Sequence, residues 1–248
     1  MSEFEPPQSR KPDSSKFRPG KFTYHQEIEV EIASLTNLGE GVARVDGWVV
    51  FIAGALAGEK IVARIWHNAA NFSRGDLVRV VVPSPHRVQP RCDLFGECGG
   101  CQYQNLAYPQ QLEWKQKQVA EAFERLGGIK TKVDACHPSP KQYGYRSKIT
   151  PHFKRPRDGK IGDIGFLLAG QRSHLVDVDH CPIAMDEINA ALLEKLVIGL
   201  RFQLAVFSEV VGPRSWKASV PFTPSLAPLV VSIRKNVRCE IVTVSPVA

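Results

Sequence analysis

Three of the chain's six cysteines lie within ten residues, in the segment "RCDLFGECGGCQYQNL" at positions 91–106. Their spacing is Cys92-x5-Cys98-x2-Cys101. Thiolates at this density are typical ligands of a soft metal centre, either zinc or an iron–sulfur cluster. Gly99 and Gly100 let the backbone turn tightly enough for the flanking sulfurs to reach one site. The alternative is a set of three buried, inert cysteines.

A metal centre of this kind needs a fourth ligand from elsewhere in the chain. The candidates are three cysteines and two histidines: Cys136, Cys181, Cys239, His137 and His180. We favour Cys181, because a cysteine followed by proline recurs as the last ligand of some cluster motifs. Zinc usually takes paired thiols two to four residues apart, so the five-residue gap favours iron–sulfur without excluding zinc.

The positive charge of the chain is concentrated in one segment. The formal net charge is +7 and the isoelectric point about 9.1. Residues 141–175 contribute eight basic side chains against Asp158 and Asp163, and the eight are Lys141, Arg146, Lys148, Lys154, Arg155, Arg157, Lys160 and Arg172. Four aromatic residues are interleaved with them: Tyr143, Tyr145, Phe153 and Phe166. This pattern fits RNA binding through phosphates and stacked bases, or an amphipathic strand pair with its aromatics in the core.

The composition and the N-terminus limit the class of protein. No stretch reaches the ~18–20 apolar residues of a transmembrane helix, and the first residues, "MSEFEPPQSRKPDSSKF", have no apolar core of a secretory signal. We therefore expect a cytoplasmic protein whose thiols are kept reduced.

The elements before the cysteines predict a small barrel. Residues 1–23 are rich in Pro, Ser, Lys and Arg and are expected to be a disordered tail. Residues 24–84 contain five runs of strand character, and in "HQEIEVEIASL" apolar residues alternate with glutamates. Asp46-Gly47 predicts a tight hairpin turn between two of the runs. Five short strands in about sixty residues favour a closed barrel of the OB type.

The elements after the cysteines predict a mixed α+β region over residues 85–204. The segment "PQQLEWKQKQVAEAFERLGG" predicts a helix that begins near Pro109, is capped by Gly127, and has one apolar stripe of Leu112, Val119, Phe123 and Leu126. Residues 143–180 read as strands, with a second hairpin at Asp158-Gly159. The segment "MDEINAALLEKLVIGLRFQL" predicts a second helix, whose stripe is Ile188, Leu192, Leu196 and Leu200.

Several of these segments together resemble a known family. The run "NLGEGVARVDGWVVFIAGALAGEKIVARI" looks like a TRAM domain, a small RNA-associated barrel. The runs "SPHRVQPRCDLFGECGGCQYQNLAYPQQLEWKQKQV", "YGYRSKI" and "IGFLLAGQRSHLVDVDHCPI" resemble, in the same order, bacterial RNA uracil-C5 methyltransferases. The resemblance covers residues 25 to about 200, and it rests on several motifs rather than one.

The resemblance implies a site and a reaction. It makes Cys92, Cys98, Cys101 and Cys181 the ligands of a structural [4Fe–4S] cluster, with zinc as the alternative. It makes the basic segment part of a surface for ribosomal or transfer RNA, with six contact residues: Arg146, Lys148, Lys154, Arg155, Arg172 and His174. In the family's reaction a cysteine thiolate adds to C6 of an extruded uracil, and C5 then takes a methyl group from S-adenosylmethionine. A base removes the C5 proton, which releases the thiolate.

The sequence also departs from the family. The glycine-rich turn of a class I methyltransferase domain is not found, since Gly212 is the one glycine after Gly199. We therefore expect that domain to be absent and assign no catalytic or cofactor-binding residue. Cys239 does not match the catalytic context, and Cys136 is expected to be a bystander.

Two further expectations follow from this departure. Residues 205–248 are interpreted as a divergent tail, read out of frame or a remnant. The apolar stripe of the first helix is expected either to take a partner chain or to repack onto the barrel. The alternative function is a non-catalytic RNA-binding module with a structural iron–sulfur or zinc site.

Overall fold

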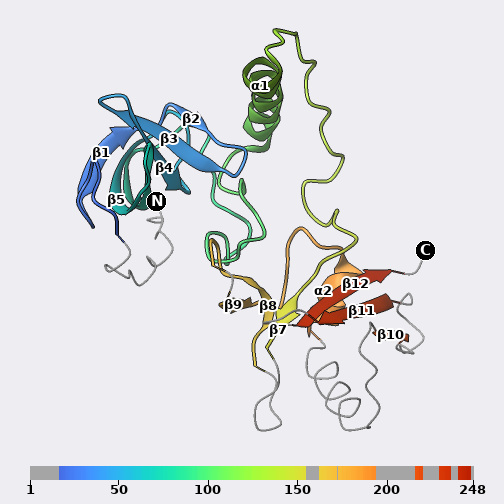
Figure 1. The fold of residues 1–248 in the computed structure, drawn as a ribbon. Coiled ribbons are helices and arrows are strands. Elements are labelled where there is room, and N and C mark those ends of the chain that lie inside the picture. The colour runs from blue at the N-terminus through green and yellow to red at the C-terminus, as the bar shows by residue number, and fades with distance from the viewer. Residues whose placement is uncertain are drawn as a thin grey trace. The chain divides into compact units, whose positions relative to one another are not determined.

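The computed structural model describes residues 17–154, 162–171 and 173–193 and three strands beyond them (Figure 1). The chain forms two compact units. The barrel unit comprises the chain up to Arg91 together with Cys101–Pro138, and the central unit comprises Cys92–Gly100 together with the chain from Ser139 onward. No helix in the described ranges is long and apolar enough to cross a membrane.

The barrel unit is built on one six-stranded sheet. Its strands in chain order are β1 (Glu27–Glu31), β2 (Ser34–Leu35), β3 (Glu40–Val45), β4 (Trp48–Ala53), β5 (Lys60–Asn68) and β6 (Phe72–Val82). The spatial order is β1-β5-β6-β4-β3-β2. Neighbours are antiparallel except β4 and β6, which run parallel. The mixed, sheet-rich fold and its barrel-like start therefore agree with the sequence-based prediction.

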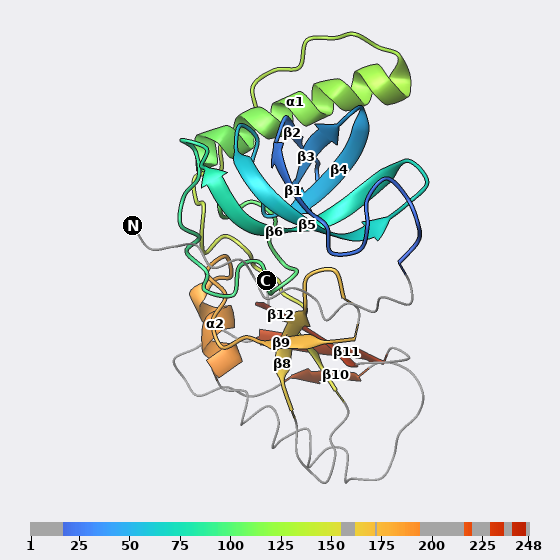
Figure 2. The same ribbon diagram turned by 90° about the vertical axis from the view of Figure 1, so that its left-hand side faces the viewer.

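The number of strands differs from the predicted five, because the first predicted strand bends. β1 and β2 are consecutive in the chain but pair at opposite edges of the sheet, β1 with β5 and β2 with β3. At the bend, the Ile32 N–H donates to Glu59 O (2.9 Å) and the Ala33 N–H donates to Val42 O (2.9 Å). One bent segment thus joins the two edges, which satisfies backbone groups that an open sheet would expose. The strands are visible in Figure 2 as a curved sheet.

The first predicted hairpin is confirmed. Asp46 and Gly47 both have positive φ, at 49° and 79°, and connect β3 to β4 with Val45 paired to Trp48. This is the two-residue turn that Asp-Gly favours. The second predicted hairpin, Asp158-Gly159, lies outside the described residues.

The predicted disordered tail is too long. Phe22 is only 5% exposed and belongs to the barrel core, and Phe17 packs against the same core. The Asn68 side-chain amide, itself buried, donates to Phe22 O (2.8 Å) and Arg18 O (3.1 Å). The boundary at residue 23 was wrong because these contacts join residues 46 and 50 positions apart, which a local composition cannot reveal.

The first predicted helix is α1 (Tyr108–Gly127), with Pro109 in its first turn. Its C-terminal cap is Gly128 (φ 64°) and not Gly127, because the left-handed residue lies one position beyond the last helical one. Gln118 Nε2 donates to Thr36 O (3.1 Å), and Trp114 packs against the buried Leu35 and Leu56. The helix therefore contacts the barrel through glutamines and one indole rather than through an apolar stripe.

The central unit has shorter elements. Its first strands are β7 (His152–Phe153), β8 (Ile164–Leu167) and β9 (Leu175–Asp177), which form an antiparallel meander. The second predicted helix is present as α2 (Asp186–Leu193), and its continuation through Leu196 and Leu200 lies outside the described residues. The core of the described part consists of Ile149, Val176, Val178, Ala184, Ile188 and Leu192.

Three strands lie in the segment interpreted as a divergent tail. They are β10 (Trp216–Ser219), β11 (Leu229–Lys235) and β12 (Glu240–Pro246). β12 pairs with β7, with Glu240 opposite Phe153 and Ile241 opposite His152, so the sheet order is β10-β11-β12-β7-β8-β9. The interpretation of residues 205–248 as a divergent tail, read out of frame or a remnant, stays a prediction.

Candidate metal centre and nucleic-acid interface

The cysteine segment is closed at its base by a short antiparallel pairing within the barrel unit. Arg87 and Leu106 form a β-bridge. On either side, the Val88 N–H donates to Asn105 O (2.9 Å) and the Ala107 N–H donates to His86 O (2.9 Å). Cys92 follows Val88 by four residues and Cys101 precedes Asn105 by four. The pairing therefore anchors both ends of the segment that carries the three clustered thiols.

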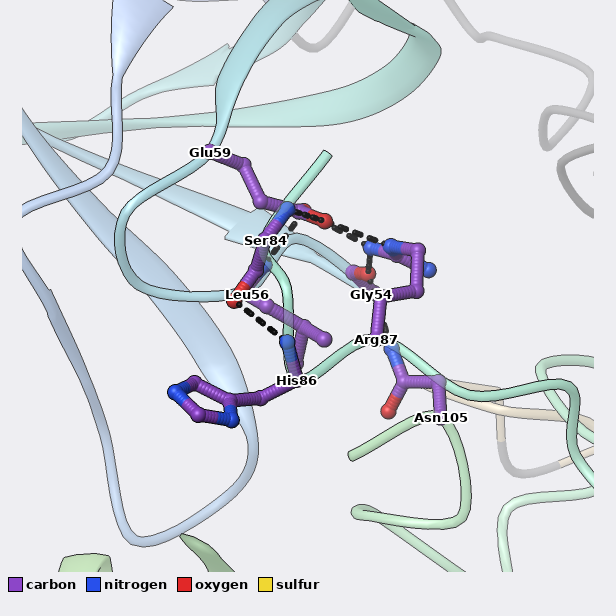
Figure 3. Close-up of polar contacts among 7 residues, drawn as sticks. All are labelled: Gly54, Leu56, Glu59, Ser84, His86, Arg87 and Asn105. Atoms are coloured by element: carbon purple, nitrogen blue, oxygen red, sulfur yellow. Dashed lines mark hydrogen bonds and ion pairs between the residues drawn. The ribbon is translucent and has the colours of Figure 1, made fainter. Parts of the chain in front are cut away.

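A buried ion pair fixes this base to the barrel (Figure 3). Glu59 is fully buried, and its carboxylate accepts from Arg87 Nε (2.5 Å) and Nη2 (2.7 Å) and from the Leu56 N–H (2.8 Å). Arg87 Nη2 also donates to Gly54 O (2.8 Å), as does Asn105 Nδ2 (3.0 Å). A buried carboxylate is tolerated only when it is paired and hydrogen-bonded, and Glu59 meets both conditions.

The cysteine loop itself, Cys92–Gly100, belongs to the central unit. Cys98 forms an antiparallel β-bridge with Leu168. The Gly99 N–H donates to Leu167 O (2.9 Å), and the Ala169 N–H donates to Glu97 O (2.6 Å). A Cβ at Gly99 would lie 3.1 Å from Leu167 O, a tight contact, so glycine suits this close approach of two backbones.

Cys181 lies in the same unit and is held by α2. The Cys181 N–H donates to Asn189 Oδ1 (2.8 Å), and Asn189 Nδ2 donates back to Cys181 O (3.1 Å). Cys181 and Leu94, from the cysteine loop, pack against the same core cluster. The structure thus places the favoured fourth cysteine and the loop of Cys92 and Cys98 in one unit.

The thiols of the described residues do not form a preformed metal site. All five cysteines that the structure describes are half-buried and none is in a disulfide. Among the same described residues, no group of three or more His, Cys, Asp or Glu side chains is arranged to hold a metal ion. The donor chemistry suits a soft metal, so the four-cysteine ligand set stays a prediction, while Cys239 lies outside the described residues.

The predicted RNA-contact side chains that the structure describes lie at the surface. Arg146, Lys148, Lys154 and His174 are exposed, whereas Arg155 and Arg172 lie outside the described residues. The Arg146 backbone is fixed by a donation to Ile183 O (2.8 Å) and an acceptance from the Met185 N–H (3.1 Å). The guanidinium is therefore presented to solvent from an ordered backbone.

The aromatic residues of that segment differ in how far they are exposed. Phe153 is 5% exposed and Phe166 packs against the central core, as the strand-pair alternative predicts. Tyr145 is 52% exposed, as RNA stacking would need.

His152 precedes Phe153 in β7. Burial lowers the pKa of His152, because the charged ring loses water.

Several residues that hold these sites were missed by sequence reasoning. Glu59, Arg87, Asn105 and Asn189 are ordinary polar residues in ordinary contexts, and no short motif singles them out. Their common signal is structural, since Glu59, Asn105 and Asn189 are buried polar side chains.

Comparison with known proteins shows which proteins this chain is similar to. Residues 21–78 match the TRAM domain. An uncharacterized RNA methyltransferase of Nostoc sp. is 35% identical over 177 residues, covering 70% of this chain and 38% of the relative. The tRNA (uracil(54)-C(5))-methyltransferase of Schizosaccharomyces pombe is 38% identical over 178 residues, covering 68% of this chain and 34% of the relative.

One solved structure is also similar in part. The tRNA (uracil-54, C5)-methyltransferase of Pyrococcus abyssi, in complex with S-adenosyl-L-homocysteine, aligns with a TM-score of 0.49 and 23% identity over 84% of this chain and 42% of that one. The chain spans little more than a third of the length of the curated relatives it matches. The expected absence of a methyltransferase domain finds no support in these matches. The predicted resemblance is confirmed: the chain carries a TRAM domain, and about two thirds of it is similar to RNA methyltransferases, among them a tRNA uracil-C5 methyltransferase.

Proposed function

We propose that this chain acts in S-adenosylmethionine-dependent methylation of uracil C5 in RNA, and that its described residues form the RNA-binding and cluster-bearing part. The observation that carries the proposal is the 38% identity over 178 residues to an enzyme named for this reaction on tRNA uracil 54. S-adenosylmethionine supplies the methyl group in that chemistry, and we assign no residue of this chain to it.

RNA contact is proposed for the basic segment of the central unit. Its support is the exposure of Arg146, Lys148 and Lys154 and the local excess of eight basic over two acidic side chains. Exposed Lys and Arg neutralise phosphates and release counterions, so they supply sequence-independent affinity. We include Arg155, Arg172 and His174 in the same proposed surface, and its substrate is transfer or ribosomal RNA.

A structural [4Fe–4S] cluster on Cys92, Cys98, Cys101 and Cys181 is the second part of the proposal. Its support is that the loop carrying Cys92 and Cys98 is hydrogen-bonded to the unit that contains Cys181. Zinc is the alternative metal for the same thiols.

A partner for the apolar side of α1 is the third part. Val119, Phe123 and Leu126 are 45%, 46% and 89% exposed, whereas Leu112 is half-buried. Exposed apolar patches favour association, so we propose that another chain or domain covers this stripe.

RNA binding and methyl transfer test the function together. Fluorescence anisotropy should show that the purified chain binds tRNA transcripts with an affinity that falls as salt rises, and that Arg146→Ala and Lys148→Ala weaken binding. Exposed Lys117→Ala on α1 is the matched control. Incorporation of label from S-adenosylmethionine into uracil C5, by this chain alone or by its full-length form, supports the reaction. Failure to bind any RNA would overturn the proposal.

A further inference from the structure

The outer face of the barrel carries a row of four aromatic rings from three adjacent strands. Phe51 lies on β4, Phe72 begins β6, and Trp66 and His67 lie near the end of β5. The ring centroids are 5.4 Å apart for Phe51 and Phe72, 6.4 Å for His67 and Phe72, and 5.6 Å for Trp66 and His67. All four side chains, here called the aromatic row, are partly exposed.

A β-bulge puts two of these rings on the same face. Ile65 and Asn68 are 0% and 1% exposed, so both side chains point into the barrel. In a regular strand, residues three apart would point to opposite faces. The pairing register shifts between Ile65 and His67, and both intervening side chains, Trp66 and His67, are therefore directed outward. Bulges that re-aim side chains in this way recur beside functional sites.

An arginine extends the aromatic row. The guanidinium of Arg74, on β6, lies 5.5 Å from the Phe51 ring centroid and 5.7 Å from that of Phe72. An ion pair with Glu40 holds it there. Aromatic rings and guanidinium planes are the two surfaces on which unpaired bases stack in RNA-binding proteins.

We propose that the aromatic row, with Arg74, is a stacking site for unpaired bases of RNA. The inference rests on the proposed function and deepens it, because it gives the barrel its own RNA contact apart from the basic segment. Residues 24–84 carry five Lys or Arg against seven Asp or Glu. A phosphate-binding surface would need an excess of positive charge, so the barrel is suited to bases rather than to the backbone of a duplex.

The test uses the whole chain and a fluorescein-labelled single-stranded oligouridine, with anisotropy as the readout. Phe72→Leu keeps apolar bulk and removes the central ring, and Trp66→Leu does the same at one end of the row. We expect each variant to weaken binding between about 5-fold and about 150-fold, the range of one lost base stack. The dependence of log Kd on log salt should keep its slope, because no phosphate contact is lost.

The matched control is Phe123→Leu, which removes a 46% exposed ring from α1 in the same unit. It should bind oligouridine like the wild type, and melting curves should show all variants folded. Wild-type affinity in both Phe72→Leu and Trp66→Leu would overturn this inference without contradicting RNA binding through the basic segment. Equal affinity for the oligouridine and its duplex with oligoadenosine would also overturn it, since a duplex offers no unpaired base. A wild-type chain that binds no RNA would overturn the inference and the proposed function together.

Discussion

The barrel unit and the central unit bury apolar side chains to different extents. The barrel has strands of up to eleven residues, and its main described core cluster contains eleven buried side chains. In the described part of the central unit, strands β7 to β9 have two to four residues, and the main core cluster contains six side chains. Apolar burial is the dominant favourable term in folding, and among the described residues the barrel has the larger share of it.

The central unit compensates with specific polar contacts. The cysteine loop adds backbone hydrogen bonds to Leu167 and from Ala169, and Asn189 bonds both the N–H and the carbonyl of Cys181. Two of the four proposed metal ligands lie in that loop, and a third is Cys181. Among the described residues the barrel is stabilised by its own core, whereas we expect the central unit to depend on the cysteine site.

The largest effect should come from the buried carboxylate of the barrel. Glu59→Ala leaves Arg87 buried without its partner, and we expect a loss of about 3–5 kcal/mol in the free energy of unfolding. The double variant Glu59→Leu/Arg87→Met should recover most of it, because no unpaired charge remains. Glu27→Ala, which breaks the exposed pair with Arg64, should cost less than about 1 kcal/mol. Urea unfolding measures the free energy of unfolding of all three variants. Equal losses in Glu59→Ala and Glu27→Ala would show that burial of the Glu59–Arg87 pair makes no difference.

The same core substitution in each unit sharpens the comparison. Ile52 in the barrel and Ile188 on α2 are 0% and 1% exposed, and either change to Ala should cost about 2–5 kcal/mol. Ile52→Ala should lower the protection from amide hydrogen exchange in the barrel unit only. Ile188→Ala should lower this protection in the central unit only. Loss of protection in both units from one substitution would show that they unfold as one.

Asn189 offers a smaller change confined to the central unit. Asn189→Ala removes its bonds to Cys181 and to Ala184 O, and we expect a loss of about 1–3 kcal/mol. Metal content should also fall, because the backbone of a proposed ligand is no longer held. Asn71→Ala, at an exposed position of the barrel, is the control and should change neither quantity. Unchanged metal content in Asn189→Ala would remove this residue from the cysteine site.

The smallest expected effect is a pH dependence of the central unit. Burial lowers the pKa of His152 from 6.5, so the folded state favours the neutral ring and the unfolded chain takes up the proton first as pH falls. The stability of this unit should therefore be full above pH 6.5 and decrease as pH falls through 6.5 toward the lower folded pKa. His152→Gln should reduce that slope in denaturation series. An unchanged slope in His152→Gln would assign the effect to other groups.

The sequence predicted those features of the fold that depend on neighbouring residues. Alternating residues in β1 and the Asp46-Gly47 turn are local signals, and the structure confirms both. Phe22 in the core, the bulge before His67 and the bend that closes the barrel depend on residues far apart in the chain. Local composition and periodicity cannot report such contacts.

The candidate sites show the same division. Three cysteines within ten residues are a local signal that the sequence shows directly, whereas the fourth ligand, Cys181, stays a prediction. Glu59 and Arg87, 28 positions apart, anchor the base of that segment, and nothing in their local sequence indicates it. The aromatic row is likewise assembled from three strands, so only the folded sheet brings its rings together.

The claim that the cysteines hold a cluster is tested most directly by metal analysis of protein purified without oxygen. Iron, acid-labile sulfide and zinc should be measured in the wild type and in Cys181→Ala, with Cys136→Ala as the control. We expect about four irons and four sulfides per wild-type chain, the same in Cys136→Ala, and loss of both in Cys181→Ala. Stoichiometric zinc without iron, or full cluster content in Cys181→Ala, would contradict a cluster on these four cysteines.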